Sequence, residues 1–235
     1  MKIFLMYYDR FENSTTSKAL NKINEEHFIL CHNNKNKFKN TFGKIIETKQ
    51  PKGIQNNFNF ALNTLNENEW AIFMSDDYKC SKILKNGKFV DCGLDKLINE
   101  LKRIILKIDN SGIKMVGFNS SGNPFYAKKK FSKFGLVDGR FFAIKKTKFR
   151  FHSEINCIPD YFASLYHLKK YGGNLIINQM FADFERYKKG GLGTEIERLN
   201  DKIKNIKILK SEFPNNIILK DKPNQPKKSH IIIKR

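Results

Sequence analysis

The sequence predicts an α/β fold with a mostly parallel sheet flanked by helices, and two observations support this prediction. First, strand-like apolar runs alternate with amphipathic helical patterns, as in parallel sheets covered by helices. Second, the apolar run that begins at Trp70 stops abruptly at Asp76 and Asp77, as expected of a buried strand with polar residues at its carboxyl end. Open α/β sheets place their ligand sites at that edge. A strand that ends in a solvated turn is the alternative, because aspartate is common in turns.

In the first half of the chain, apolar periodicity and local start signals define each element. Lys2–Tyr8 is a buried run, a short helix opens at Ser14 or Thr15, and a helix with one apolar face follows Gly53. Lys85–Lys88 has the composition of a hairpin turn. The expected strands are 2–8, 27–31, 44–47 and the run from Trp70, and the expected helices are 14–26 and 54–65.

In the second half, longer helices separate short strands. Pro159 lies in the first turn of its helix, where proline is tolerated, and Gly172 stops that helix. Asp138–Arg140 marks a bend or bulge in a strand. We expect one domain over residues 1–220 and a basic, flexible C-terminal tail over 221–235. The expected helices are 94–108, 159–170 and 195–213, and the expected strands are 114–118, 135–144 and 174–178.

The charge of the chain is strongly positive. Its 235 residues include 44 Lys and Arg against 23 Asp and Glu, which leaves a net charge of +21. Such an excess favours a polyanionic partner, namely nucleic acid, a membrane surface or phosphorylated substrates. The sequence is also rich in lysine, asparagine, isoleucine and phenylalanine, so the mutational bias of an AT-rich genome is the alternative source of the charge.

Cysteine spacing and hydropathy bear on the compartment. No two cysteines are closely spaced, so the sequence indicates neither a zinc site nor a disulfide framework and favours a reducing cytoplasm. The N-terminal apolar run is too short for a signal peptide, and no stretch approaches membrane-spanning length. We expect a cytoplasmic protein without stable membrane insertion, in the host cytoplasm if a phage encodes it. The cysteines are Cys31, Cys80, Cys92 and Cys157.

The segment 186–194 combines basic residues with glycines. Gly190, Gly191 and Gly193 free the backbone to fold tightly, and the preceding cations suit a loop that closes over a diphosphate. The segment is not a Walker loop, because it lacks the Gly-Lys-Thr ending. A mobile solvated loop is the alternative interpretation.

Asp160 lies at the start of a predicted helix, where a carboxylate commonly caps the helix or interacts with its dipole. If it faces a cleft, the same carboxylate can accept the proton of an acceptor hydroxyl. Glu154 is the nearby competitor for the role of base.

Aromatic and basic residues interleave in one stretch before residue 135. Phe125 and Tyr126 can stack on exposed bases or sugars, while the lysines that follow can neutralise phosphates. A solvated loop over core aromatics explains the same pattern. The lysines are Lys128, Lys129 and Lys130.

Together these segments resemble nucleotide-sugar glycosyltransferases of the GT-A fold, which implies a Rossmann-like sheet. Tyr7–Arg10 is similar to the family's donor-binding strand end, and Gly53–Leu65 followed by Trp70–Asp77 is similar to the helix and strand of its Asp-x-Asp metal motif. Pro159–Leu165 is similar to the start of its Glu-Asp-x-Asp helix. With the loop Gly190–Thr194, the chain more narrowly resembles the phage TET-associated glycosyltransferases, which glycosylate hydroxymethylated pyrimidines in DNA.

The resemblance implies roles for the residues at matching positions. Asp77 takes the metal role with Mg²⁺ or Mn²⁺, Asp76 contacts a ribose or the sugar, and Asp160 is the base, which implies inversion at the sugar carbon. The chain departs from the family in having Ser75 where the acidic triplet begins and Asp160 as the sole carboxylate of its helix start. The nucleotide-sugar donor, with a UDP-sugar favoured, is expected to contact Tyr7, Asp9, Arg10, Asn57, Gly190, Gly191 and Gly193.

We therefore expect a metal-dependent hexosyltransferase that moves a sugar from a nucleotide diphosphate sugar to the hydroxyl of a hydroxymethylated pyrimidine in DNA. Two alternatives remain: a glycosyltransferase that acts on a surface polysaccharide, a lipid-linked acceptor or a protein, and a nucleic-acid-binding module without catalysis. The expected DNA contacts are Phe125, Tyr126, Lys128, Lys129 and Lys130.

Overall fold

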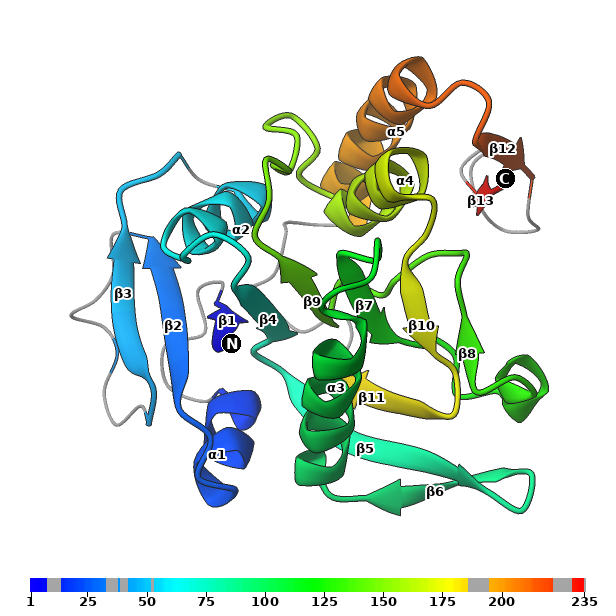
Figure 1. Cartoon of the computed structure of the whole chain (residues 1–235). Helices are drawn as coiled ribbons and strands as arrows, with labels where there is room; N and C mark the ends of the chain where they lie inside the picture. The colour runs from blue at the N-terminus through cyan, green and yellow to red at the C-terminus, as the bar shows by residue number, and fades with distance from the viewer. Residues whose placement is uncertain are drawn as a thin grey trace.

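The computed structural model arranges the chain as a large sheet with helices on both faces (Figure 1). The helices are α1 (Thr15–Lys22), α2 (Ile54–Asn63), α3 (Leu94–Ile108), α4 (Pro159–Tyr171), α5 (Glu195–Glu212) and the short 3-10 helix η2 (Pro124–Ala127). The strands are β1 (Lys2–Met6), β2 (His27–His32), β3 (Lys44–Thr48), β4 (Trp70–Ser75), β5 (Tyr78–Lys85), β6 (Lys88–Cys92), β7 (Met115–Phe118), β8 (Phe131–Ser132), β9 (Phe141–Lys145), β10 (Leu175–Ile177), β11 (Met180–Phe184), β12 (Ile217–Lys220) and β13 (His230–Ile233). The described residues are 1–7, 14–32, 38, 42–51, 53–185, 195–221 and 230–234.

The central sheet has the strand order β3-β2-β1-β4-β9-β7-β10-β8. The strands β3, β2, β1 and β4 are parallel neighbours, and β10 is parallel to β7. Between them, β9 runs antiparallel to both β4 and β7. A separate antiparallel sheet consists of β11, β5 and β6, and β12 pairs with β13. The predicted fold class, an α/β fold with a large, mostly parallel sheet flanked by helices, is confirmed.

The apolar core has two halves because the sheet is covered on both faces. Phe4 and Met6 of β1 belong to the half that includes apolar residues of α2, α4 and α5. Ile3 and Leu5 belong to the other half, together with Leu20 of α1 and the apolar face of α3. Successive side chains of a strand point to opposite faces, so each inner strand must be apolar throughout. This requirement explains the continuous apolar runs in the sequence.

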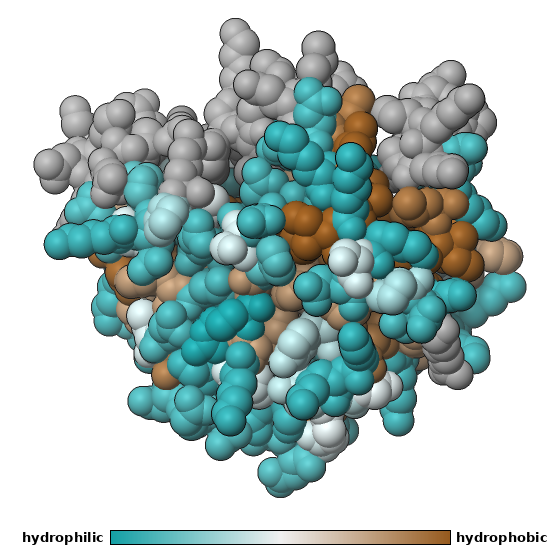
Figure 2. Space-filling model, turned by 90° about the horizontal axis from the view of Figure 1, so that it is seen from above, coloured by the Kyte–Doolittle hydropathy of each residue, from teal (hydrophilic) through white to brown (hydrophobic). Residues whose placement is uncertain are grey.

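The face seen from above in Figure 2 is mostly hydrophilic, with hydrophobic groups interspersed among the polar side chains. Exposed apolar residues are found on α5 and β12, at Ile203 and Ile218. Within the described part of the chain, none of the helices combines the length and the apolar character that membrane crossing requires.

Two predicted features agree closely with the structure. The helix α3 covers the predicted residues 94–108. The strands β5 and β6 are joined at the predicted hairpin turn, where Asn86 and Gly87 have positive φ angles of 49° and 74°. Positive φ at both central residues is typical of tight hairpin turns.

Other boundaries differ from the predictions. The strand expected from residue 135 begins only at Phe141, because Gly135 has a φ of 138° and the carboxylate of Asp138 accepts a hydrogen bond from the backbone of Arg140. The helix expected to reach residue 26 ends at Lys22. The strand β11 was not predicted, and the expectation of a flexible tail is wrong for β13, where a β-branched run pairs with β12.

The turn that follows β4 is attached to the N-terminus of α1. The Ser14 hydroxyl donates to the carbonyl of Asp76 at 3.0 Å, and the Thr16 hydroxyl donates to the carbonyl of Ser75 at 2.6 Å. Thr16 Oγ1 also accepts from the backbone N–H of Tyr78 at 2.9 Å. Because Thr16 is fully buried, its hydroxyl satisfies backbone groups that water does not reach. These bonds fix the direction in which the chain leaves β4.

Thr16→Val should lower the free energy of unfolding by about 2 kcal/mol, because valine keeps the shape of threonine but leaves buried backbone groups unpaired. Urea denaturation measures the change. Thr15→Val is the matched control, since Thr15 is exposed at the first position of the same helix. Equal stability of the two variants would contradict the anchoring role of Thr16.

Candidate functional site

Two strand ends bring charged residues to one edge of the central sheet. The strand β4 ends at Ser75, and β9, which is antiparallel to it, begins at Phe141. The backbone N–H of Ser75 donates to the carbonyl of Arg140 at 2.9 Å. Two residues further, the carbonyl of Asp77 accepts from the backbone N–H of Glu185 at 2.9 Å. The end of β4, the start of β9 and the end of β11 therefore meet.

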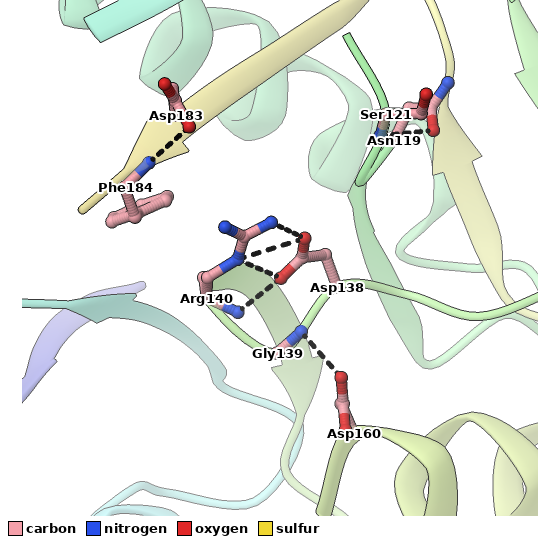
Figure 3. A network of polar contacts seen from close by, with 8 residues as sticks. All are labelled: Asn119, Ser121, Asp138, Gly139, Arg140, Asp160, Asp183 and Phe184. Atoms are coloured by element: carbon pink, nitrogen blue, oxygen red, sulfur yellow. Dashed lines mark hydrogen bonds and ion pairs between the residues drawn. The ribbon is translucent and has the colours of Figure 1, made fainter. Parts of the chain in front are cut away.

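Arg140 forms a bidentate ion pair with Asp138 at this edge (Figure 3). Its Nε lies 2.9 Å from one carboxylate oxygen, and its Nη2 donates to the other. The guanidinium carbon lies 5.7 Å from the centre of the Phe184 ring. Hydrogen bonding to Asp138 raises the pKa of Arg140, and the charges of Asp183 and Asp77 act in the same direction. One cation thus interacts with three carboxylates from three segments.

Asp160 contacts the same loop from the first turn of α4 (Figure 3). Its Oδ2 accepts from the backbone N–H of Gly139 at 3.4 Å, and its Oδ1 accepts from that of Tyr161 at 3.0 Å. A Cβ atom on Gly139 would lie 2.8 Å from the Asp160 Cβ, so a larger residue would displace the loop or the helix. Burial raises the pKa of Asp160 to about 6, with the charge of Asp138 as the next cause.

The acid–base properties of this edge are those of a proton acceptor that lies near another carboxylate. A carboxylate with a pKa of about 6 is mostly ionised at neutral pH, yet basic enough to take a proton. Burial, with the charges of Asp160 and Asp138, raises the pKa of Tyr161 to about 12. The Tyr161 hydroxyl therefore stays protonated near neutral pH, so of these two groups only Asp160 can accept a proton there.

The donors at this edge fit a divalent cation that a bound substrate helps to coordinate. The described ranges contain no group of three or more His, Cys, Asp or Glu side chains that could hold a metal ion. Mg²⁺ needs only one or two protein carboxylates when phosphate oxygens and water supply the other ligands, and Mn²⁺ prefers the same donors. The charges of Asp77 and Asp183 both raise the pKa of Arg140, and the Asp183 carboxylate also lies 3.8 Å from the Lys79 ammonium.

The described residues that were predicted to bind the donor lie along the carboxyl edge of the parallel strands. Tyr7 follows β1 and is buried, with its ring 4.9 Å from that of Phe38. The Asn57 Oδ1 accepts from the hydroxyl of Thr48, the last residue of β3, at 3.1 Å. Asp76 is 8% exposed. Outside the described residues lie Asp9, Arg10, Gly190, Gly191 and Gly193.

The predicted DNA contacts form a surface cluster on and after η2. Phe125 and Tyr126 are 64% and 63% exposed, and their ring centres lie 5.4 Å apart in an edge-to-face arrangement. The ammonium of Lys128 lies 4.6 Å from the centre of the Phe125 ring. Lys129 and Lys130 follow, and the ammonium of Lys130 lies 3.8 Å from a glutamate oxygen on α3. Exposed rings beside cations provide what base stacking and phosphate binding require.

Three charged residues at the sheet edge lie outside the predicted site: Asp138, Arg140 and Asp183. The sequence signal for the first two is a pair of opposite charges around Gly139, directly before a buried run. The signal for Asp183 is an acidic residue in the short alternating run Met180–Phe184. The register between β11 and β5 shifts between Asp183 and Phe184, and bulges of this kind are common beside active sites.

Asp160→Asn should stabilise the protein by about 2 kcal/mol near pH 7.5 and by much less near pH 4. The folded-state pKa of about 6 exceeds the ordinary value, so the stability that this group contributes is complete below its unfolded pKa and is lost as the pH rises through 6. Asparagine removes the cost of the buried charge and keeps one oxygen for the Gly139 N–H, although it gives up the bond to the Tyr161 N–H.

Urea denaturation at both pH values measures this effect, and Glu154→Gln is the control, because Glu154 is an exposed carboxylate just before α4. A stability gain for Asp160→Asn that is equal at the two pH values would contradict the raised pKa.

The sequence matches no protein-family model and no curated protein. Among solved structures, a mycobacterial protein has 9% sequence identity and a TM-score of 0.53 over 98% of this chain and 81% of that chain. The 4-diphosphocytidyl-2C-methyl-D-erythritolsynthase from Anaerococcus prevotii has 10% identity and a TM-score of 0.42 over 88% of this chain and 96% of that chain. The likeness to the mycobacterial protein concerns the fold alone.

Proposed function

We propose that this chain is a GT-A-like, nucleotide-sugar-dependent glycosyltransferase whose acceptor is the hydroxyl of a hydroxymethylated pyrimidine in DNA. The observation that carries the proposal is the environment of Asp160. Its carboxyl group, with a pKa of about 6, lies beside the Asp138–Arg140 ion pair at the edge where the strand before Asp77 ends. A general base works best when its pKa is near the operating pH.

Sugar transfer to a hydroxyl requires a base that removes the hydroxyl proton during attack. In this proposal Asp160 accepts that proton while the acceptor oxygen forms a bond to the anomeric carbon. The bond from that carbon to the diphosphate breaks on the opposite face, and the electron pair leaves with the diphosphate. The configuration at the sugar carbon is therefore inverted. Tyr161 does not compete for the proton, because its pKa is about 12.

The leaving diphosphate gains negative charge, and Arg140, which follows Gly139 in the loop that Asp160 contacts, is the cation proposed to stabilise it. Arg140 is held by Asp138 through Nε and Nη2, and its Nη1 forms no hydrogen bond within the described ranges (Figure 3). This nitrogen is available for a phosphate oxygen. Asp77 is the residue proposed to hold Mg²⁺ or Mn²⁺, which when bound neutralises charge on the diphosphate. A UDP-sugar is the proposed donor.

The acceptor part of the proposal is supported by the surface cluster at η2 and by the net charge of +21. The hydroxymethyl group of a base in a duplex is reached only when the base is flipped out or single-stranded. Phe125 and Tyr126 expose ring faces on which other bases of the bound strand can stack, and Lys128 lies against the first ring.

A transfer assay tests the function directly. It combines the protein, Mn²⁺ or Mg²⁺, a panel of nucleotide sugars and single-stranded DNAs that carry cytosine, hydroxymethylcytosine or hydroxymethyluracil. We expect a hexose-sized mass gain on the hydroxymethylated nucleoside only. Asp160→Asn should lower the rate at least about 100-fold, because it removes the general base. The wild-type kcat/KM should fall as the pH drops below about 6.

Glu154→Gln is the control for the assay, since it removes the competing carboxylate near α4 without touching the Asp138–Arg140 loop. Full activity of Asp160→Asn would exclude the proposed base. Transfer to polysaccharide or protein with all DNAs unmodified would exclude the proposed acceptor. If the protein binds DNA but transfers sugar from none of the donors, a nucleic-acid-binding module without catalysis would be favoured.

Phe125→Ala and Tyr126→Ala should each weaken binding of a single-stranded oligonucleotide by about 1–2 kcal/mol, because each removes a stacking surface. Fluorescence anisotropy measures the affinity. Both rings are exposed, so we expect no loss of folded-state stability. Phe42→Ala is the matched control, because Phe42 is an aromatic residue that is 54% exposed outside the cluster. An equal loss of affinity in the control would contradict the role of the η2 cluster.

A further inference from the structure

A cavity of about 480 Å³ lies between α3 and the ends of β5 and β10. Its volume is within the range of small-molecule pockets. Ile83, Ile177 and Met180 line it with apolar side chains. A strand rises about 3.3 Å per residue, so Ile83 lies roughly 20 Å along β5 from Asp77. This cavity, the α3 pocket, is therefore separate from the edge that holds Asp160.

The polar lining of the α3 pocket is mainly cationic. Lys96 and Arg103 come from α3, Lys130 comes from the segment after η2, and Glu100 is the single carboxylate among the lining residues. Arg103 donates to Glu100 through Nε at 2.7 Å and Nη2 at 2.6 Å. Hydrogen bonding to Arg103 lowers the pKa of Glu100, so this carboxylate is ionised at neutral pH. Three cations against one carboxylate leave the lining with an excess of two positive charges.

One of these cations has no neutralising partner among the described residues. The Lys96 ammonium forms no hydrogen bond or ion pair with any residue that the structure describes. Lys130 is 3.8 Å from the shared carboxylate, longer than a hydrogen bond. Both groups can therefore bind an anion without first breaking a short contact.

The combination of lining groups distinguishes between kinds of anion. A bare phosphate would use the cations but leave the apolar walls unoccupied, and an aliphatic carboxylate would need neither several cations nor amides. A nucleotide uses all of them: its base packs on the apolar walls, its base edge bonds to the amides, and its phosphate meets the cations. The amides are those of Asn99 and Gln179.

We propose that the α3 pocket binds a nucleotide, as a second site distinct from the candidate catalytic edge. The same chemistry is offered by a free nucleotide and by one nucleotide within a DNA strand. Lys130 belongs both to this pocket and to the η2 cluster, so the two surfaces adjoin. The proposal concerns binding alone and stands whether or not the chain transfers a sugar.

Two variants test different halves of the pocket. The double variant Lys96→Gln with Arg103→Gln removes two cations. Asn99→Trp instead places a large ring in the pocket without changing its charge. All three positions are exposed on α3, so we expect the fold to be preserved. Lys22→Gln with Lys148→Gln is the matched control, since it removes two exposed charges outside the pocket. The ligands are thymidine 5′-monophosphate, measured by calorimetry, and a fluorescein-labelled oligothymidylate, measured by anisotropy.

We expect each pocket variant to weaken binding about tenfold or more, and the control to change it less than about twofold. If the pocket variants lose affinity for the mononucleotide, the ligand is a free nucleotide. If they lose affinity for the oligonucleotide alone, the ligand is a nucleotide within a strand. The proposal is overturned if the wild-type protein binds neither ligand, if Asn99→Trp binds normally, or if the control loses as much affinity as the pocket variants.

Discussion

The antiparallel ladder between β4 and β9 determines where the candidate site lies. Because β9 runs against β4, the residues that enter β9 lie beside those that leave β4, and the Ser75 N–H bonds to the Arg140 carbonyl. Trp70–Met74 is buried, so a shift of the pairing register between β4 and β9 by one residue would turn every β4 side chain to the wrong face of the sheet. If β9 ran parallel to β4, Arg140 would lie at the opposite edge from Asp77, and the cluster of charges would not form.

The ion pair within this cluster gives the two neighbouring carboxyl groups, those of Asp138 and Asp160, different surroundings. Arg140 directs Nε and Nη2 at the carboxylate of Asp138. Asp160 receives only backbone N–H groups and lies near that anion in a buried position, so its pKa rises. A carboxyl group whose pKa is raised by its surroundings is common among the acid–base residues of active sites.

The sequence predicted the parts of the fold that depend on local patterns. The apolar stripe of α3, the turn at Asn86 and Gly87 and the buried run from Trp70 each follow from residue types within one short window. The direction of β9 does not follow from such a window, because a fully buried apolar strand has the same pattern whether its neighbour is parallel or antiparallel. The strand β11 has only five residues, so its alternating pattern is too short to stand out in the sequence.

The same distinction applies to the candidate site. Asp77 and Asp160 were predicted because each follows a recognisable start or end of an element, a strand end and a helix start. Arg140 and Asp183 were missed because their relevance depends on strands that are distant in sequence, and a charged residue near a bend has the composition of an ordinary turn. Non-local pairing, rather than residue type, makes them neighbours of Asp77.

The ladder between β5 and β11 links the candidate site to the α3 pocket. At the end near the candidate site, β5 begins directly after Asp77 and β11 carries Asp183. At the other end, Met180 of β11 pairs with Ile83 of β5, and both residues line the pocket. A paired ladder fixes the distance between its ends more firmly than a loop would. Under the proposed function, a nucleotide of the acceptor strand that binds in the pocket would therefore be held at a set distance from Asp160. Such positioning would change how tightly the strand binds without changing the groups that raise the pKa of Asp160.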